Sequence, residues 1–224
     1  MSVSFAQLTV DASGGNETQK DVVITFNTLG GETPSGDAVI VSGALTSPTD
    51  GDVIDQTIVS RHDWDDASAL AALDASAYIS GLTSGENVHQ GGGGLGNAFG
   101  DNDLVETTEV LIFSFDTTGL NASGILQLTD IQFFDNSGLP FSYDIFFFDS
   151  SANSLSQTTV AGAATNSGFV SALDNGDQVI VNPVTGDFRI QQWTLDIVAV
   201  PEPSTFALLG GLLAFVSTML RRRR

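Results

Sequence analysis

The sequence predicts an all-β protein, a β-sandwich of jelly-roll type, and three observations support this fold class. Short runs rich in Val, Ile, Thr and Phe recur along residues 1–200, separated by clusters of Gly, Asn, Asp and Ser. Several runs alternate apolar and polar residues, as half-buried strands do. Fifteen phenylalanines are available to fill a core between two sheets. About ten strands at this spacing favour a sandwich or jelly roll.

Ten segments are expected to be strands. They are residues 3–10, 21–27, 38–45, 53–59, 109–115, 125–134, 142–148, 156–160, 178–181 and 188–200. Alternation is clearest in EVLIFSF at residues 109–115, where Phe113 and Ser114 fall on opposite faces. In the last segment Trp193 falls on the face opposite Phe188 and Ile190, so alternation leaves open which face is buried.

One segment breaks the strand pattern and predicts a short helix near residues 64–77. The segment is rich in Ala and Leu, and Asp63 is the expected N-cap because a carboxylate can accept the first free backbone N–H groups. The residues expected to share its apolar face are Ala69, Leu70, Leu73 and Ala77. We expect this helix to cover one end or edge of the sandwich.

The glycine-rich stretch from Gly91 to Asn97 is expected to be a long surface loop between two halves of one domain. A phosphate-binding loop needs a strand before it and a helix with Lys-Ser/Thr after it, and this chain has neither there. Residues 1–200 are therefore expected to form one domain without an inner linker.

Charge and cysteine content exclude several classes of function. Residues 1–200 hold 26 acidic side chains against Lys20, Arg61 and Arg189, a formal charge of −23, and the whole chain carries −20. A nucleic-acid partner is not expected, because its phosphates require a basic footprint. The chain has no cysteine, so it has neither disulfides nor thiolate metal sites. Cations are compatible partners, although acidic surfaces also simply favour solubility.

The best candidate for a metal site is the cluster Asp101, Asn102, Asp103 and Glu106. Calcium takes six to eight oxygen ligands, and closely spaced carboxylates and carbonyls in a loop can surround it. The spacing is not that of an EF-hand, since the glycine and the final glutamate of that loop are missing. A calcium site and a solvated acidic turn are both compatible with this cluster.

No sequence motif for catalysis is found. His62 and His89 are the only histidines, and Asp63 follows His62 directly. Adjacent residues of an extended chain point to opposite sides, so this pair is not expected to face each other, and no catalytic histidine is predicted. An acid pair for glycoside hydrolysis cannot be tested in a chain with so many carboxylates.

Aromatic side chains that could stack on sugar rings are few. The four candidates are Trp64, Tyr78, Tyr143 and Trp193, and packing in the core is the alternative for each of them. The sequence therefore assigns no glycan-binding residues.

The last 24 residues have three parts with a clear physical order. The turn Pro201-Glu202-Pro203-Ser204 precedes the uncharged run 206–220, and the chain closes with the cluster Arg221, Arg222, Arg223 and Arg224. Fifteen helical residues would span about 22 Å, less than the roughly 30 Å of a hydrocarbon core. The arginines would stay on the cytoplasmic side. This segment is expected to be a hydrophobic helix that forms a marginal membrane span.

This tail closely resembles the PEP-CTERM sorting signal of exported bacterial proteins. The resemblance lies in Val200-Pro201-Glu202-Pro203-Ser204-Thr205, the Leu/Gly/Ala run and the arginine cluster, and it covers about a tenth of the chain. It implies recognition by exosortase, a membrane-embedded cysteine protease or transpeptidase that removes the tail, usually in Gram-negative bacteria that make exopolysaccharide. A permanent single-span anchor is the alternative. The stretch Gly96–Glu106 and the strand after it loosely resemble the jelly-roll ectodomains of such proteins.

The sequence therefore predicts an exported, non-enzymatic protein of the cell envelope or extracellular matrix, possessing an ectodomain over residues 1–200 and a sorting signal over residues 201–224. Glycan binding is a candidate role for such a protein, and a secreted polysaccharide hydrolase or lyase is the alternative. Membrane contact is expected only through the tail, before processing. Export requires an N-terminal signal, but residues 3–10 resemble a strand, so an in-frame signal is expected upstream of Met1.

Overall fold

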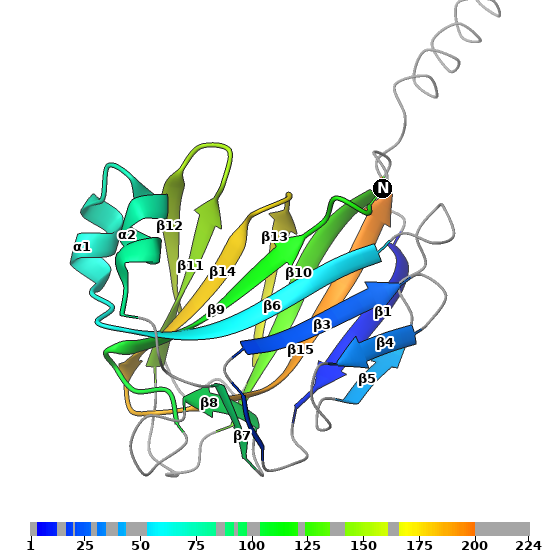
Figure 1. The fold of residues 1–224 in the computed structure, drawn as a ribbon, viewed down its shortest axis with the longest axis horizontal. Coiled ribbons are helices and arrows are strands. Elements are labelled where there is room, and N and C mark those ends of the chain that lie inside the picture. The colour runs from blue at the N-terminus through cyan, green and yellow to red at the C-terminus, as the bar shows by residue number, and fades with distance from the viewer. Residues whose placement is uncertain are drawn as a thin grey trace, which may run out of the picture.

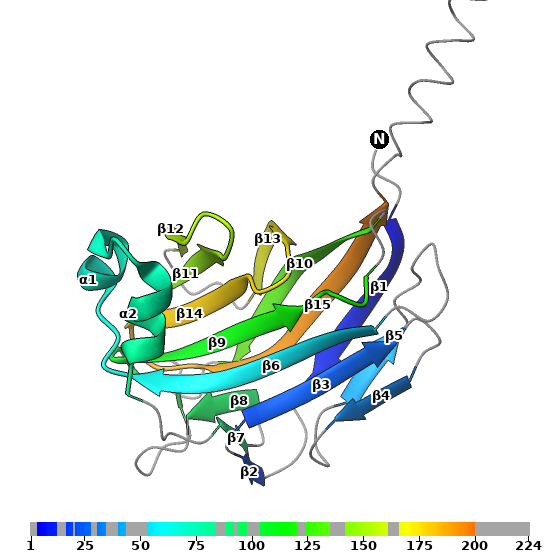
Figure 2. The same cartoon turned by 45° about the horizontal axis from the view of Figure 1, so that its top comes forward.

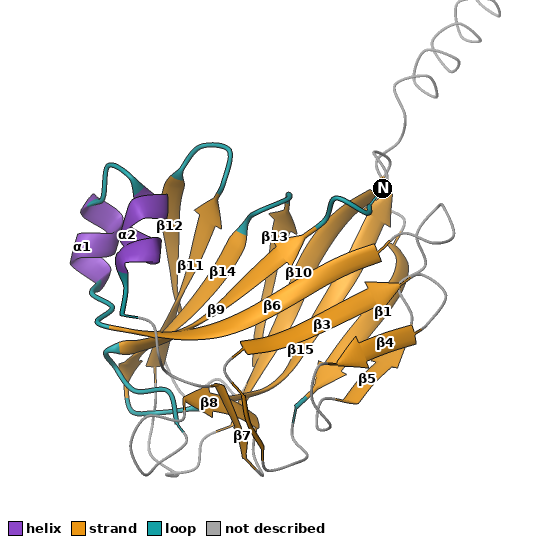
Figure 3. Cartoon of the chain, viewed as in Figure 1, coloured by secondary structure: helices purple, strands orange, loops and turns teal. Residues whose placement is uncertain are grey.

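A computed structural model describes residues 4–12, 17–19, 21–27, 31–34, 40–43, 53–83, 88–91, 94–97, 104–120, 124–134, 142–160 and 166–199. These residues form antiparallel strands and two short helices (Figures 1 and 3). The hydrophobic helix predicted for residues 206–220 lies outside the described residues. Within the described part, no helix is long and apolar enough to cross a membrane.

The strands form two sheets, which confirms the all-β sandwich. One sheet has eight strands in the order β13-β10-β15-β8-β7-β2, and β1 pairs with both β15 and β5. Its strands are β1 (Ser4–Asp11), β2 (Glu17–Gln19), β5 (Ile40–Gly43), β7 (Val88–Gly91), β8 (Gly94–Asn97), β10 (Gly124–Phe134), β13 (Asn166–Leu173) and β15 (Arg189–Ala199).

The other sheet has seven strands in the order β12-β11-β14-β9-β6-β3-β4. Its strands are β3 (Asp21–Asn27), β4 (Gly31–Pro34), β6 (Val53–His62), β9 (Glu109–Asp116), β11 (Ser142–Asp149), β12 (Ser154–Val160) and β14 (Gln178–Thr185). The ten predicted strands are all present, with ends that differ by a few residues.

The main core lies between the two sheets. Phe113 of the seven-stranded sheet meets Trp193 of the eight-stranded sheet edge to face, with ring centroids 5.4 Å apart. Trp193 also donates a hydrogen bond from Nε1 to Oε1 of Gln56, 3.0 Å away, and both side chains are fully buried. This bond satisfies the indole N–H, which would otherwise be costly to bury.

The open question about β15 is resolved by a β-bulge. Phe188, Ile190 and Trp193 are all fully buried, so both sides of the sequence alternation contribute to the core. The pairing of β15 with β10 shifts register between Gln132 and Phe133, which pair with Gln192 and Ile190. The extra residue, Gln191, reverses the alternation at this point of β15.

The predicted single helix near residues 64–77 is wrong, because the segment forms two helices, α1 (Asp66–Ala71) and α2 (Ala75–Gly81). Asp65, not Asp63, caps α1 by accepting a 2.7 Å hydrogen bond from the backbone N–H of Ser68. Asp74 caps α2 in the same way, through the N–H of Ala77. A cap residue needs an extended backbone, so Asp74 interrupts what would otherwise be one helix.

The buried face of this segment also differs from the expected one. Of the predicted set only Ala69 is buried, while Leu70, Leu73 and Ala77 are exposed. Ala75 and Ile79 of α2 are buried instead. The break before Ala75 reorients α2 relative to α1, so the helical spacing counted from Ala69 does not continue across it.

The prediction of a loop over Gly91–Asn97 is wrong for the residues that the structure describes. Gly91 ends β7, and Gly94 begins β8, which pairs with β7 as a hairpin. Gly94 has a φ of 131°, and a Cβ at this position would lie 2.4 Å from the carbonyl oxygen of Ile190. Glycine is therefore required here because the hairpin backbone approaches β15 closely.

Candidate functional site

The two helices lie on the outer face of the seven-stranded sheet, which is the face turned away from the eight-stranded sheet. Figures 1 and 2 place α1 and α2 at the end of this sheet where β6 finishes and β9 begins. They form a second hydrophobic cluster with the outward-facing residues of β9, β11 and β14. Its buried members are Trp64, Ala69, Ala75, Ile79, Leu82, Val110, Ile112, Phe146, Phe148 and Ile180.

His62 and Asp63 hold the start of this helical segment, and here the structure contradicts the prediction that they would not face each other. His62 Nδ1 lies 2.9 Å from Asp63 Oδ1. The contact forms because Asp63 adopts a left-handed backbone conformation, with a φ of 67°, and so is not part of an extended strand.

The same two residues connect both ends of the helical segment to the sheet. Asp63 Oδ2 accepts a 2.5 Å hydrogen bond from the hydroxyl of Thr83, and the backbone N–H of His62 donates to the carbonyl of Thr83. The hydrogen bonds from Thr83 and then His62 lower the pKa of Asp63. His62 Nε2 lies 3.4 Å from the hydroxyl of Thr108. These contacts hold the helical segment against the sheet. Neither His62 nor Asp63 lines the pocket that lies beneath α2.

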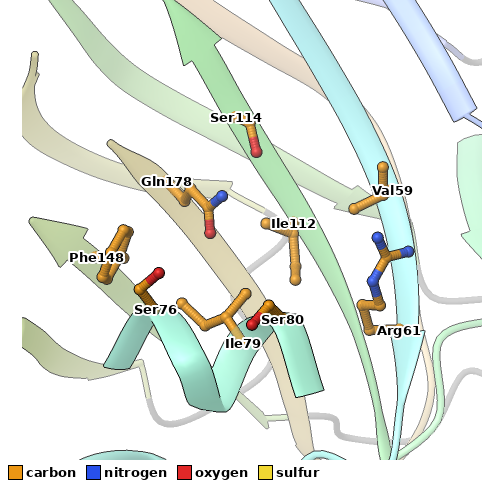
Figure 4. Close-up of a pocket in the computed structure, with 9 residues that line it drawn as sticks. All are labelled: Val59, Arg61, Ser76, Ile79, Ser80, Ile112, Ser114, Phe148 and Gln178. Atoms are coloured by element: carbon orange, nitrogen blue, oxygen red, sulfur yellow. The ribbon is translucent and has the colours of Figure 1, made fainter. Parts of the chain in front are cut away.

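A pocket of about 300 Å³ lies between α2 and the outer face of the seven-stranded sheet (Figure 4). Strands β6, β9, β11 and β14 supply its floor and sides, and two serines and an isoleucine of α2 close it. Its lining is Val59, Arg61, Ser76, Ile79, Ser80, Ile112, Ser114, Phe148 and Gln178. This volume is at the lower end of the roughly 300–1,000 Å³ usual for small-molecule sites.

The strand register explains how this lining arises. Phe148 of β11 pairs with Gln178 of β14, and Gln178 pairs with Ser114 of β9. These three side chains therefore form a row across the sheet, with an apolar residue at one end and polar residues along the rest. The next row places Val59 beside Ile112, both of which line the pocket. Side chains two residues apart share a face, so the alternation of β6 brings Arg61 to the same surface as Val59.

Two polar groups of the pocket have hydrogen-bonding capacity to spare. The carbonyl Oε1 of Gln178 is shielded from solvent and has no hydrogen-bond partner. Arg61 donates from Nη1 to the backbone oxygen of Ser60, 2.8 Å away, which uses one of the five guanidinium N–H groups. In Figure 4 Arg61 and Gln178 lie on opposite sides of the pocket, with Ile112 between them.

A pair of carboxylates lies on the same outer face but does not line this pocket. The pKa of Asp66 is raised, mainly because the carboxyl group is partly buried. The hydrogen bond from Trp64 lowers this pKa, and the nearby negative charge of Asp144 raises it. The indole Nε1 of Trp64 donates to Asp66 over 2.6 Å, and the side-chain amide of Gln157 donates to the buried Asp144. These contacts hold the pair against α1 and β12.

Three of the four aromatic candidates for sugar stacking are buried. Trp193 and Tyr143 are fully buried in the main core, and Trp64 is buried against Phe146, with ring centroids 5.0 Å apart. Tyr78 is half-buried, and its hydroxyl is hydrogen-bonded to the backbone of Asp65. Core packing, the alternative given above, therefore accounts for Trp64, Tyr143 and Trp193.

Most of the predicted metal cluster lies outside the described residues, namely Asp101, Asn102 and Asp103. Glu106 is exposed, and its backbone N–H donates to Oε2 of Glu109, 2.9 Å away. Among the residues described, no group of three or more His, Cys, Asp or Glu could hold a metal ion. Calcium binding therefore stays a prediction.

If calcium binds this cluster, millimolar calcium raises the melting temperature more than equal magnesium does. At a hundred times Kd, binding to the folded state alone adds about 2.7 kcal/mol. For a chain of this size, roughly 2–4 °C is expected per kcal/mol. Magnesium should add less because it demands strict octahedral geometry. Thermal unfolding of the wild type and of a double variant, Asp101→Ala with Asp103→Ala, measures this. Equal shifts for both ions, or an unchanged shift in the variant, would leave only a solvated turn.

Comparison with known protein families gives a match in the C-terminal segment. Residues 199–224 match the model of the PEP-CTERM protein-sorting motif. The chain carries a PEP-CTERM sorting motif. Its residues Pro201, Glu202, Pro203 and Ser204 and its four terminal arginines all lie within the matched segment, outside the residues that the structure describes. No curated protein and no solved structure matches the chain.

The PEP-CTERM motif indicates an exported protein that exosortase recognises and sorts. It also implies that the C-terminal segment anchors the chain in the membrane as a sorting signal. The match confirms the resemblance to a PEP-CTERM sorting signal that the tail sequence indicated, and it shows that the protein is exported. It says nothing about the chemistry of the residues before the motif.

Proposed function

We propose that this PEP-CTERM protein is a non-enzymatic protein of the cell envelope or extracellular matrix that binds a glycan in the pocket beneath α2. The observation that carries the proposal is the composition of the pocket. Arg61, Gln178 and three serines offer hydrogen-bonding groups around a floor of Ile112, and sugars present both hydroxyl groups and apolar ring faces. The side-chain amide of Gln178 lines the pocket, and an amide can both donate a hydrogen bond to a sugar hydroxyl and accept one from it.

A binding role is favoured over the alternative of a polysaccharide hydrolase or lyase by where the acids lie. Glycoside hydrolysis generally needs two carboxyl groups that flank the bond to be broken. None of the described residues lining the pocket is acidic, and the pair Asp66 and Asp144 lies outside that lining, beside α1 and β12. We therefore expect no increase in reducing ends when the exported protein is incubated with the polysaccharides that it binds.

Filling the pocket should abolish binding while leaving the fold intact. Ser80 is exposed on α2 and lines the pocket, so Ser80→Trp places a large ring at its opening. We expect at least about a tenfold loss of affinity, equivalent to 1.4 kcal/mol, for oligosaccharides that the wild type selects from an array of neutral and acidic glycans. Ser68→Trp is the matched control, because Ser68 is exposed on α1 away from the pocket. Equal affinity of both variants would contradict the proposed site, and no glycan bound by the wild type would contradict the proposed function.

A further inference from the structure

One of the three basic residues in the first 200 lines this pocket. Arg61 is half-buried on the outer face of the seven-stranded sheet, whereas Arg189 begins β15 in the other sheet. The side chain of Arg61 donates to the backbone oxygen of Ser60, and it forms no ion pair with a carboxylate in the described part of the chain. For a chain with 27 acidic residues and seven basic ones, an arginine without such a partner is unexpected.

The remaining bonding capacity of Arg61 matches a carboxylate. After its bond to Ser60, the guanidinium keeps four N–H groups. A planar guanidinium edge can donate two parallel hydrogen bonds to the two oxygens of a carboxylate, and such charge-assisted bonds are stronger than neutral ones. Arg61 as a whole is half-buried, and partial exclusion of water strengthens such an interaction.

The local charge of the pocket differs in sign from that of the whole chain. Its described lining contains one arginine and no acidic residue, although the chain carries a formal charge of −20. Repulsion from distant acids is screened beyond about 8 Å at physiological ionic strength, while contact with Arg61 is not. An anionic group that reaches the pocket therefore meets a positive centre without a competing carboxylate.

We propose that the ligand is an acidic glycan, recognised through the carboxylate of a uronic acid residue by Arg61. This inference rests on the proposed function, since it specifies the class of glycan that the same pocket takes. The side-chain amide of Gln178, on the opposite side of the pocket, hydrogen-bonds a hydroxyl of that sugar, and the apolar floor at Ile112 contacts the ring (Figure 4). Two chemically different ends of one sugar unit are thus recognised together, which a free inorganic anion cannot satisfy.

The test compares uronate oligosaccharides with the same chains after chemical reduction of each carboxyl group to an alcohol. The probes are oligomers of glucuronate, galacturonate and mannuronate, their reduced counterparts and a sulfated neutral oligosaccharide, titrated into the exported protein by calorimetry. We expect the wild type to bind at least one uronate oligomer about tenfold or more tightly than its reduced form, as charge-assisted hydrogen bonds require.

Two variants identify the residue responsible. Arg61→Gln should bind the uronate and reduced forms equally, whereas Arg189→Gln, which changes the net charge by the same amount in the other sheet, should keep the preference. Thermal unfolding of both variants establishes that they are folded. Wild-type binding that is equal for the acidic and reduced chains would overturn the uronate inference while the glycan-binding function stands. Tighter binding of the sulfated probe would also overturn it, and binding of no probe would overturn both.

Discussion

Replacing Pro201, Glu202 and Pro203 together by alanine is expected to stop processing of the protein. The matched PEP-CTERM segment contains these three residues between the exported part and the apolar run. Both prolines favour an extended chain, and alanine would allow the helix predicted from the sequence for residues 206–220 to extend back through the recognition site. In a host with exosortase we expect the variant to stay in the membrane at full length, while the wild type is released from its tail.

Fractionation of the host envelope and intact-mass measurement decide this prediction. Ser167→Ala, which lies in β13 far from the tail in sequence, is a control for the effect of substitution itself. A triple-alanine variant that is processed like the wild type would show that the turn is not what exosortase reads. A wild-type protein that keeps Arg221–Arg224 and stays in the membrane would instead support a permanent anchor.

The second large effect is expected from Trp193→Ala, which should destabilise the sandwich by about 3–5 kcal/mol. Trp193 is fully buried between the sheets, contacts Phe113 and donates its indole hydrogen to Gln56. Alanine is too small to fill the space of the indole, so the variant leaves a cavity. It also has no side-chain N–H, so Oε1 of Gln56 loses its hydrogen-bond donor. For a chain of this length, the melting temperature should fall by roughly 6–20 °C.

Thermal unfolding with two companion variants separates the causes. Trp193→Phe keeps most of the apolar volume and loses the hydrogen bond, so its melting temperature should lie between those of the wild type and the alanine variant. Leu73→Ala removes a fully exposed leucine and should change stability by less than about 0.5 kcal/mol. If Trp193→Ala and Leu73→Ala behaved alike, Trp193 would not be a core residue, and its role as a surface for sugars would need to be considered again.

Strands could be predicted from the sequence where apolar and polar residues alternate strongly. Short strands and strands rich in Gly, Ser or Thr could not be predicted in this way. The segment 109–115 alternates as expected, with Phe113 inside and Ser114 outside. Strands β2, β4, β7, β8 and β13 were not predicted, because their short or Gly-, Ser- and Thr-rich sequences lack a hydrophobic period. The bulge at Gln191 leaves a mark in the sequence, because the apolar positions change phase between Ile190 and Trp193. Only the register with β10 shows that an extra residue causes this change.

The candidate pocket was also beyond sequence reasoning, for a physical reason. Its residues come from four strands and one helix, which are brought together by strand pairing, such as that of Gln178 with Ser114 and Phe148, and by the position of α2 over the sheet. One feature of the sequence pointed toward the pocket, because Arg61 is one of only three basic residues among the acidic residues 1–200. The sorting motif, by contrast, is a continuous segment whose order alone carries its meaning, so it was recognisable without any structure.

Nuclear magnetic resonance tests most directly whether the pocket beneath α2 is the binding site of this exported protein. The exported protein, labelled with ¹⁵N, would be titrated with the oligosaccharide that it binds most tightly. We predict the largest shifts for the Nε–H of Arg61, the side-chain amide of Gln178 and the backbone amides of Ser76 and Ser80. Largest shifts at residues outside the pocket, such as the turn at Ser150–Asn153, with Arg61 and Gln178 unchanged, would contradict the claim.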